Sequence, residues 1–133
     1  MSKEELQNNY LDFLRKEGFS GTLDDDGDID FKFEGDKYVL FVDENDPEYF
    51  RIQAGYGCDF DSDDSVAKHM EAANAVNAEY KLGKIFIRVE KELVLLETSL
   101  FIADPNGYKP FFKRCLGILQ GMISDFADKL KEE

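Results

Sequence analysis

The 133-residue chain has no tryptophan, one histidine, two cysteines and three prolines, and it is short of basic residues. Its 29 aspartates and glutamates outnumber its 16 lysines and arginines, which gives a formal charge of −13 at pH 7. A protein that binds nucleic acid or an anionic membrane surface needs a cationic footprint, and this balance does not provide one. The chain also has no apolar run of roughly 18 residues, the length that would span a bilayer. We therefore expect neither nucleic acid nor a membrane as a partner.

The scarcity of sulfur and imidazole also limits the chemistry. His69, Cys58 and Cys115 do not supply the nitrogen and sulfur ligands that a transition-metal site normally uses. The cysteines form no CxxC motif, and the first residues lack the apolar segment of a secretory signal. We expect free thiols, a reducing cytoplasmic location and no cofactor.

Motifs for catalysis are absent from the sequence. It contains neither GxSxG nor a phosphate-binding GK[ST] loop, and the Gly55-Tyr56-Gly57 segment has Phe60 where a dinucleotide fingerprint needs its third glycine. A nucleophile pair of Cys58 and His69 would need a third residue to orient the imidazole, and no local signature supplies it. The sequence therefore predicts a protein that is not an enzyme.

The negative charge is concentrated in one part of the chain. Residues 24–64 hold fifteen acidic and three basic residues, a net charge of −12, whereas the remainder has a net charge of −1. Two acidic runs, 24–30 and 59–64, have aspartates at the 1, 3, 5 spacing of an EF-hand loop. Both runs lack the glycine at position 6 and the glutamate at position 12. Specific calcium binding is thus disfavoured, and the sequence does not say whether the two runs converge.

Apolar periodicity and turn residues predict eight secondary-structure elements. Ser2 and Glu5 form the capping box that begins the first helix. The predicted elements are a helix at 3–17, strands at 29–33, 38–42 and 49–56, a helix at 65–80, strands at 85–89 and 93–102, and a helix at 110–131. The α-β-β-β-α-β-β-α order and the short connections predict one α+β domain over residues 1–133, with helices packed against an antiparallel sheet.

The last predicted helix has an apolar face that is broader than the stripe of a typical surface helix. Five of its apolar residues recur at alternating intervals of four and three, as in a helix–helix seam. They are Phe112, Leu116, Leu119, Ile123 and Phe126. The face either packs on the sheet or extends into contact with a second protein chain. We predict these five residues as candidates for protein binding or dimerisation.

Two asparagines in the second predicted helix form another candidate feature. Asn74 and Asn77 are three residues apart and so lie on one helix face. Asparagine is unfavourable inside helices because its side chain competes for backbone partners. Either the pair is exposed to solvent, or its side chains act as a structural clamp on a neighbouring strand or loop.

The segment VAKHMEAANAVNAEYKLGKIFIRVEKELVLLETSLFI resembles the YbjN family, whose members have an alanine-rich helix with paired asparagines followed by a strand–turn–strand. The preceding FKFEGDKYVLFVDENDPEYFRI resembles the three-stranded part of the family. That family is similar in fold to type III secretion chaperones, which are small, acidic, often dimeric proteins that bind partner segments. The resemblance implies this chaperone-like fold and a binding role, and it brings no catalytic residues.

Three functional hypotheses follow from these features. The first is a non-enzymatic protein-binding module, chaperone-like or regulatory, that binds a client or itself as a homodimer. The second is an acidic inhibitor or immunity-type protein that associates electrostatically with a cationic partner. The third is a divalent-metal-binding protein that uses clustered carboxylates.

Overall fold

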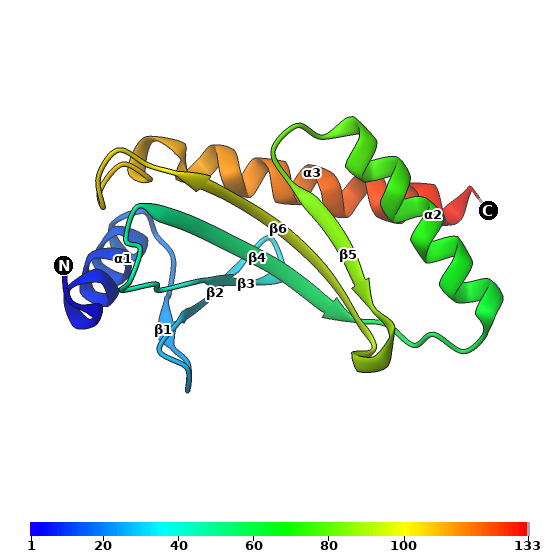
Figure 1. Ribbon diagram of the computed structural model, residues 1–133, viewed down its shortest axis with the longest axis horizontal. Helices are drawn as coiled ribbons and strands as arrows, with labels where there is room; N and C mark the ends of the chain where they lie inside the picture. Colours follow the sequence, from blue (N-terminus) through cyan, green and yellow to red (C-terminus); the bar gives the residue numbers. More distant parts are fainter. Residues whose placement is uncertain (133) are drawn as a thin grey trace.

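The computed structural model describes residues 1–132 and is shown in Figure 1. In chain order the elements are α1 (Lys3–Lys16), β1 (Thr22–Leu23), β2 (Ile29–Phe33), β3 (Asp36–Leu40), β4 (Tyr49–Gly57), α2 (Asp63–Glu79), β5 (Lys84–Arg88), η1 (Val89–Lys91), β6 (Leu93–Phe101), η2 (Lys109–Phe111) and α3 (Phe112–Lys131). The predicted α+β class and element order are confirmed. The short strand β1 is an addition that the sequence pattern did not predict.

The strands form one six-stranded antiparallel sheet in the order β1-β2-β3-β4-β6-β5. Glu34 and Gly35 have φ angles of 52° and 83° and make the two-residue turn that joins β2 to β3. Strands β4 and β6 pair over nine residues, from Tyr49 opposite Phe101 to Gly57 opposite Leu93. Figure 1 shows these two long strands curving across the molecule.

Local capping sets where the helices begin. The capping box of Ser2 and Glu5 is present at the start of α1. Helix α2 begins earlier than predicted because the hydroxyl of Ser62 accepts from the N–H of Ser65. The two aspartates that follow Ser62 therefore lie in the first helical turn, where the helix dipole favours negative charge. None of the helices in residues 1–132 is long and apolar enough to cross a membrane.

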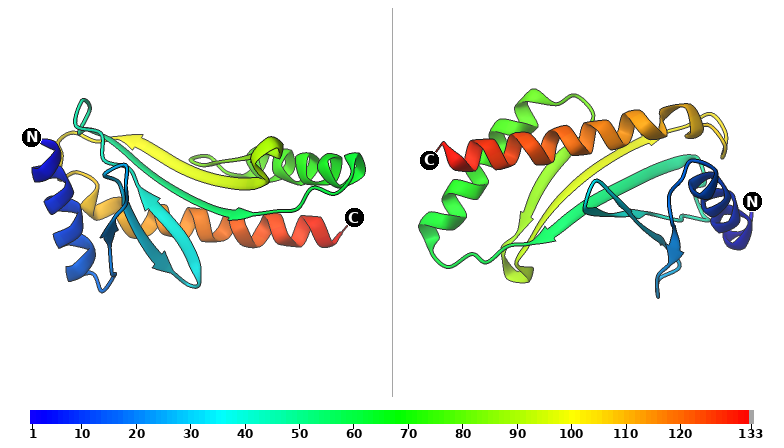
Figure 2. Two further views of the ribbon diagram at one scale, coloured as in Figure 1. Left: turned by 90° about the horizontal axis from the view of Figure 1, so that it is seen from below. Right: turned by 180° about the vertical axis from the view of Figure 1, so that it is seen from behind.

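The core lies between the sheet and the helices. Figure 2 shows α3 along one face of the sheet. Helix α1 lies near one end of α3, and α2 lies near the other end, beside β5. Aromatic contacts of Tyr10 with Phe50 and of Phe13 with Phe112 pack α1 on the face that α3 covers. The largest fully buried side chains are Tyr10, Tyr38, Tyr108, Phe50, Phe112, Phe126, Leu6, Leu14, Ile29, Leu40, Ile52 and Leu96.

The opposite face of the central strands carries no helix in the part of the chain that the structure describes (Figure 1). Along β4, residues Phe50, Ile52 and Ala54 are buried toward the helices, and the residues between them point to the other side. We call this other side the open face. Its side chains include Tyr49, Arg51, Gln53, Lys84, Glu97 and Phe101.

Candidate functional site

The five residues predicted as a contact surface on α3 belong mostly to the core of this chain. Phe112, Leu116, Leu119 and Phe126 are buried, and Ile123 is half-buried. In this conformation four of the five side chains pack in the core and are not available to a partner. The apolar face of α3 is broad because the helix packs against the sheet, α1 and α2 together.

Both asparagines are exposed residues of α2, and only Asn77 acts as a clamp. Asn77 donates from Nδ2 to the carbonyl of Ile85 at 3.0 Å and accepts at Oδ1 from the Ile85 N–H at 2.7 Å. This clamp ties α2 to the outer edge of β5. Asn74 is exposed, and its side chain makes no hydrogen bond within residues 1–132.

A buried carboxylate lies at the centre of the open face. Glu97 is 4% exposed, and its Oε1 accepts from Arg51 Nε at 2.8 Å and from Gln53 Nε2 at 2.9 Å. The ammonium of Lys84 lies 3.5 Å from the other carboxylate oxygen. Burying a charge is costly unless it is paired, and here three neighbouring side chains both pair the carboxylate and cover it. This site was not predicted from the sequence. The feature that could have indicated it is Glu97 itself, the single charged residue in the otherwise mostly apolar segment 93–102.

Aromatic side chains lie on the same face as this polar centre. Tyr49 and Phe101 are cross-strand partners with ring centroids 5.4 Å apart, and Phe101 is 78% exposed. The guanidinium carbon of Arg51 lies 3.9 Å from the ring centroid of Phe41, within cation–π range. The open face thus combines a fixed polar centre with exposed aromatic surface, a composition that is typical of protein interfaces.

Cys58 and His69, which were considered from the sequence as a possible pair, are brought together in the structure. The Sγ of Cys58 is 3.3 Å from Nε2 of His69, and Nδ1 of His69 is 2.7 Å from the carbonyl of Ser65. Donation from Nδ1 to that carbonyl leaves Nε2 as the acceptor of the thiol proton. Burial raises the pKa of the Cys58 thiol, and the carboxylates of Asp59 and Asp61 act in the same direction. Both effects favour the protonated thiol over the thiolate, which is the nucleophilic form.

The aspartates of the first acidic run are close together for structural reasons. Ligand-type oxygens of Asp24, Asp26 and Asp28 lie within 4.8 Å of one another. Asp24 Oδ1 accepts from the N–H groups of Asp26 and Asp28, both at 2.9 Å. Asp28 Oδ1 accepts from the N–H of Val42 at 2.8 Å. These bonds hold a turn together and account for the spacing without an ion.

The two acidic runs do not converge. Figures 1 and 2 place the turn at 24–28 and the loop at 59–62 at opposite ends of the molecule. The turn at 24–28 instead meets the turn after β3, where Asp43 and Glu44 line the same shallow hollow as Asp26 and Asp28. A carboxylate site that combines both runs is thereby excluded in this conformation.

The architecture is that of an α+β domain with three helices and a six-stranded antiparallel sheet. A family model described as "YbjN: Putative bacterial sensory transduction regulator" matches residues 9–130, so the chain belongs to the YbjN family. A search of the curated proteins finds no match.

Two solved structures share the fold. The crystal structure of YbjN from E. coli, described as a "putative transcription regulator", is 12% identical with a TM-score of 0.68, over 88% of this chain and 87% of that one. A chain from the HopA1-SchA chaperone-effector complex is 18% identical with a TM-score of 0.60, over 96% of this chain and 98% of that one. The fold resemblance to a type III secretion chaperone is confirmed.

Proposed function

We propose that this chain is a non-enzymatic protein-binding module, chaperone-like or regulatory, that uses the open face to bind a client protein and acts as a homodimer. The observation that carries the proposal is the 78% exposed ring of Phe101, packed beside the half-buried ring of Tyr49 on a sheet face without a covering helix. Large rings exposed on such a face gain from burial against a partner, at roughly 25 cal/mol per Å² of apolar area.

The family and the fold support this choice of partner. One structure of the same fold comes from a complex between a chaperone and its effector, so that fold is compatible with binding another polypeptide. The raised pKa of the Cys58 thiol and the pairing of the Glu97 carboxylate support a non-enzymatic role.

Serine substitutions at Tyr49 and Phe101 test client binding. The tagged wild-type protein should retain a specific set of cytosolic proteins from its source organism, and the Y49S/F101S variant should lose them. The F111S variant is the matched control, because Phe111 is a 41% exposed ring on the short η2 turn, outside the open face. Equal retention by Y49S/F101S and F111S would contradict the role of the open face.

The homodimer is tested separately, on another part of the surface. Met70 on α2 and Leu82 in the turn after it are exposed apolar side chains near β5. Light scattering across micromolar concentrations should give twice the 15.3 kDa chain mass for the wild-type protein and a lower mass for M70S/L82S. A monomer throughout that range would remove the dimer from the proposal.

The second candidate function is binding of a cationic partner by the acidic end of the molecule. The turns that contain Asp26, Asp28, Asp43 and Glu44 lie together and concentrate negative charge there. Electrostatic steering of this kind makes the association rate fall steeply with salt, whereas binding through the open face gives a shallow dependence. A salt titration against a confirmed partner distinguishes the two candidates.

A further inference from the structure

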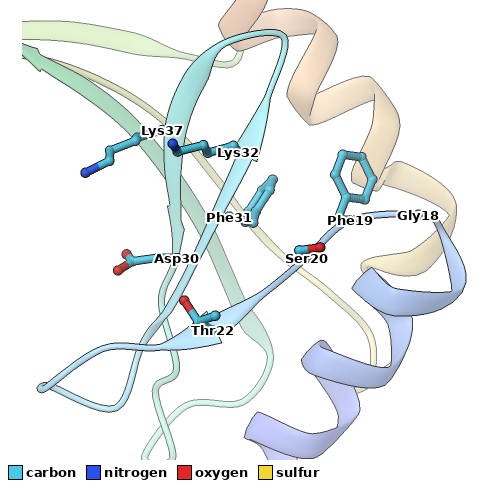
Figure 3. A pocket seen from close by; sticks show the side chains of 8 residues that line it. All are labelled: Gly18, Phe19, Ser20, Thr22, Asp30, Phe31, Lys32 and Lys37. Atoms are coloured by element: carbon cyan, nitrogen blue, oxygen red, sulfur yellow. The ribbon is translucent and has the colours of Figure 1, made fainter.

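The edge of the sheet beside β1 is only partly paired. Strand β1 pairs two residues with β2, Thr22 with Asp30 and Leu23 with Ile29. If this register continued, Ser20 would lie opposite Lys32, but the pairing ends at Thr22. A cavity of about 600 Å³ lies between the segment 18–22 and the strands β2 and β3, as Figure 3 shows. We call it the edge hollow, and its lining residues are Gly18, Phe19, Ser20, Thr22, Asp30, Phe31, Lys32 and Lys37.

The backbone of Lys32 is directed at the edge hollow. The N–H of Asp24 donates to the carbonyl of Asp28 at 2.8 Å, so the Asp28 carbonyl points toward β1. Backbone groups of successive strand residues alternate in direction, and those of Asp30 and Lys32 therefore point the same way as those of Asp28. Asp30 is opposite Thr22, whereas the backbone of Lys32 has no partner on that side among residues 1–132. An unpaired strand edge of this kind is a template for another strand.

The two sides of the edge hollow differ in chemistry. The rings of Phe19 and Phe31, with centroids 5.6 Å apart, lie on the side toward α3 (Figure 3). The side chains of Lys32 and Lys37 extend on the other side, and these two residues are directly opposite each other in the β2–β3 pair. Asp30 is the single acidic residue among those that line the edge hollow.

The two lysines are unusual in their surroundings. Neither ammonium group has a carboxylate within 4.0 Å in the described part of the chain. Like charges directly opposite in a sheet are destabilising. These lysines are also two of the three basic residues in the acidic stretch 24–64. An anionic group that bound between them would relieve their repulsion.

We propose that the edge hollow binds an extended acidic segment of a partner protein as an additional β-strand beside Lys32. Alternate side chains of an added strand point to opposite faces. One set would be acidic and contact Lys32 and Lys37, and the other would be apolar and pack against Phe19, because Phe31 is already buried in the core. The inference rests on the proposed protein-binding function and adds the chemistry of the partner segment, which alternates acidic and apolar residues.

A short peptide tests the proposal directly. Fluorescein-labelled GEVEVEG, amidated at its C-terminus, should bind the wild-type protein in an anisotropy titration, and GKVKVKG should not. The K32E/K37E variant should bind GEVEVEG about tenfold or more weakly, since two ion pairs are lost and replaced by repulsion. The control variant K91E/K109E changes the net charge of the chain by the same amount, at two exposed lysines outside the edge hollow. It should retain binding of GEVEVEG. Equal affinities for the two double variants would overturn the proposal.

Hydrogen exchange tests whether the peptide binds as a strand. Addition of GEVEVEG should slow exchange of the Lys32 amide, because its N–H gains a carbonyl acceptor. Unchanged exchange at Lys32, or displacement of the peptide by inorganic phosphate at constant ionic strength, would overturn the assignment of a peptide strand. The Y49S/F101S variant should still bind GEVEVEG, so failure at the edge hollow is distinguishable from failure of client binding at the open face.

Discussion

The side-chain amide of Asn77 pairs with both backbone groups of Ile85, as a neighbouring β-strand would. Its two hydrogen bonds, at 3.0 and 2.7 Å, satisfy the outward-pointing N–H and C=O of Ile85 at the edge strand β5. The helix that carries Asn77 is thereby fixed to the sheet, and part of this edge is protected from pairing with another chain.

Replacing Asn77 with alanine should destabilise the fold by about 1–3 kcal/mol, because Ile85 is buried and its backbone groups would lose their partners. The Asn74→Ala variant is the matched control and should change the free energy of unfolding by less than about 0.5 kcal/mol, since Asn74 is exposed like Asn77 but takes no part in the hydrogen bonds to Ile85. Urea denaturation measures both. Equal effects of the two substitutions would contradict the clamp.

The Lys37→Glu substitution should stabilise the protein by about 0.2–1 kcal/mol, because it replaces the like-charge pair with Lys32 by an opposite-charge pair. The double variant K32E/K37E restores a like-charge pair and should lose this gain. Thermal and urea unfolding measure the change. A destabilised Lys37→Glu variant would contradict this prediction.

Cys58 should react slowly with iodoacetamide at pH 8. Its alkylation rate should go on rising at pH values where the rate for a free cysteine has already levelled off. Burial raises the pKa of Cys58, so the thiolate forms at higher pH than in a free cysteine. Cys115 is buried, which raises its pKa to about 11, and it should remain unmodified until the protein unfolds. Mass spectrometry follows both. Fast alkylation of Cys58 at pH 7 would instead indicate an activated nucleophile.

Asp28→Asn should stabilise the protein at pH 7 and lose this advantage in acid. Partial burial raises the pKa of Asp28, with Asp24 and Asp26 contributing in the same direction. The folded protein thus binds the Asp28 proton more tightly than the unfolded chain does. The stability that this proton contributes is present below the ordinary aspartate pKa and is lost as pH rises through the folded-state pKa. Asparagine mimics the protonated form at every pH and retains an oxygen that can accept from Val42.

Melting temperatures at pH 7 and pH 3 measure the effect. The exposed Asp25→Asn variant is the control for the removal of one charge from the same turn. Two outcomes would contradict a destabilising charge at Asp28. One is a rise in melting temperature at pH 7 that is no larger for Asp28→Asn than for Asp25→Asn. The other is a rise for Asp28→Asn that is as large at pH 3 as at pH 7.

Periodicity along the chain was sufficient to predict most of the fold. Alternation over 29–33 and 49–56, and the helical spacing of the three helices, arise from local geometry that repeats within each element. Strand β1 was missed because two exposed residues show no period. The start of α2 was placed too late because Ser62, rather than the residues after it, caps the helix.

The candidate surfaces were harder to predict. An apolar stripe shows that a helix is enclosed, but the stripe does not identify the neighbour. For Phe112, Leu116, Leu119 and Phe126 that neighbour is the core of this chain. Helical spacing likewise placed Asn74 and Asn77 on one face, and it could not show that only Asn77 reaches Ile85.

The sequence by itself determined the negative charge, the order of helices and strands and the lack of familiar catalytic motifs, because these depend on composition or on residues that are near in the chain. Only the tertiary structure decided which face of the sheet stays open, how Glu97 is paired and where β1 stops pairing. The pairing of Glu97 and the uncovered face depend on β6 inserting between β4 and β5 and on where the helices pack against the sheet. Such long-range pairing depends on packing across the whole domain, which no local pattern specifies.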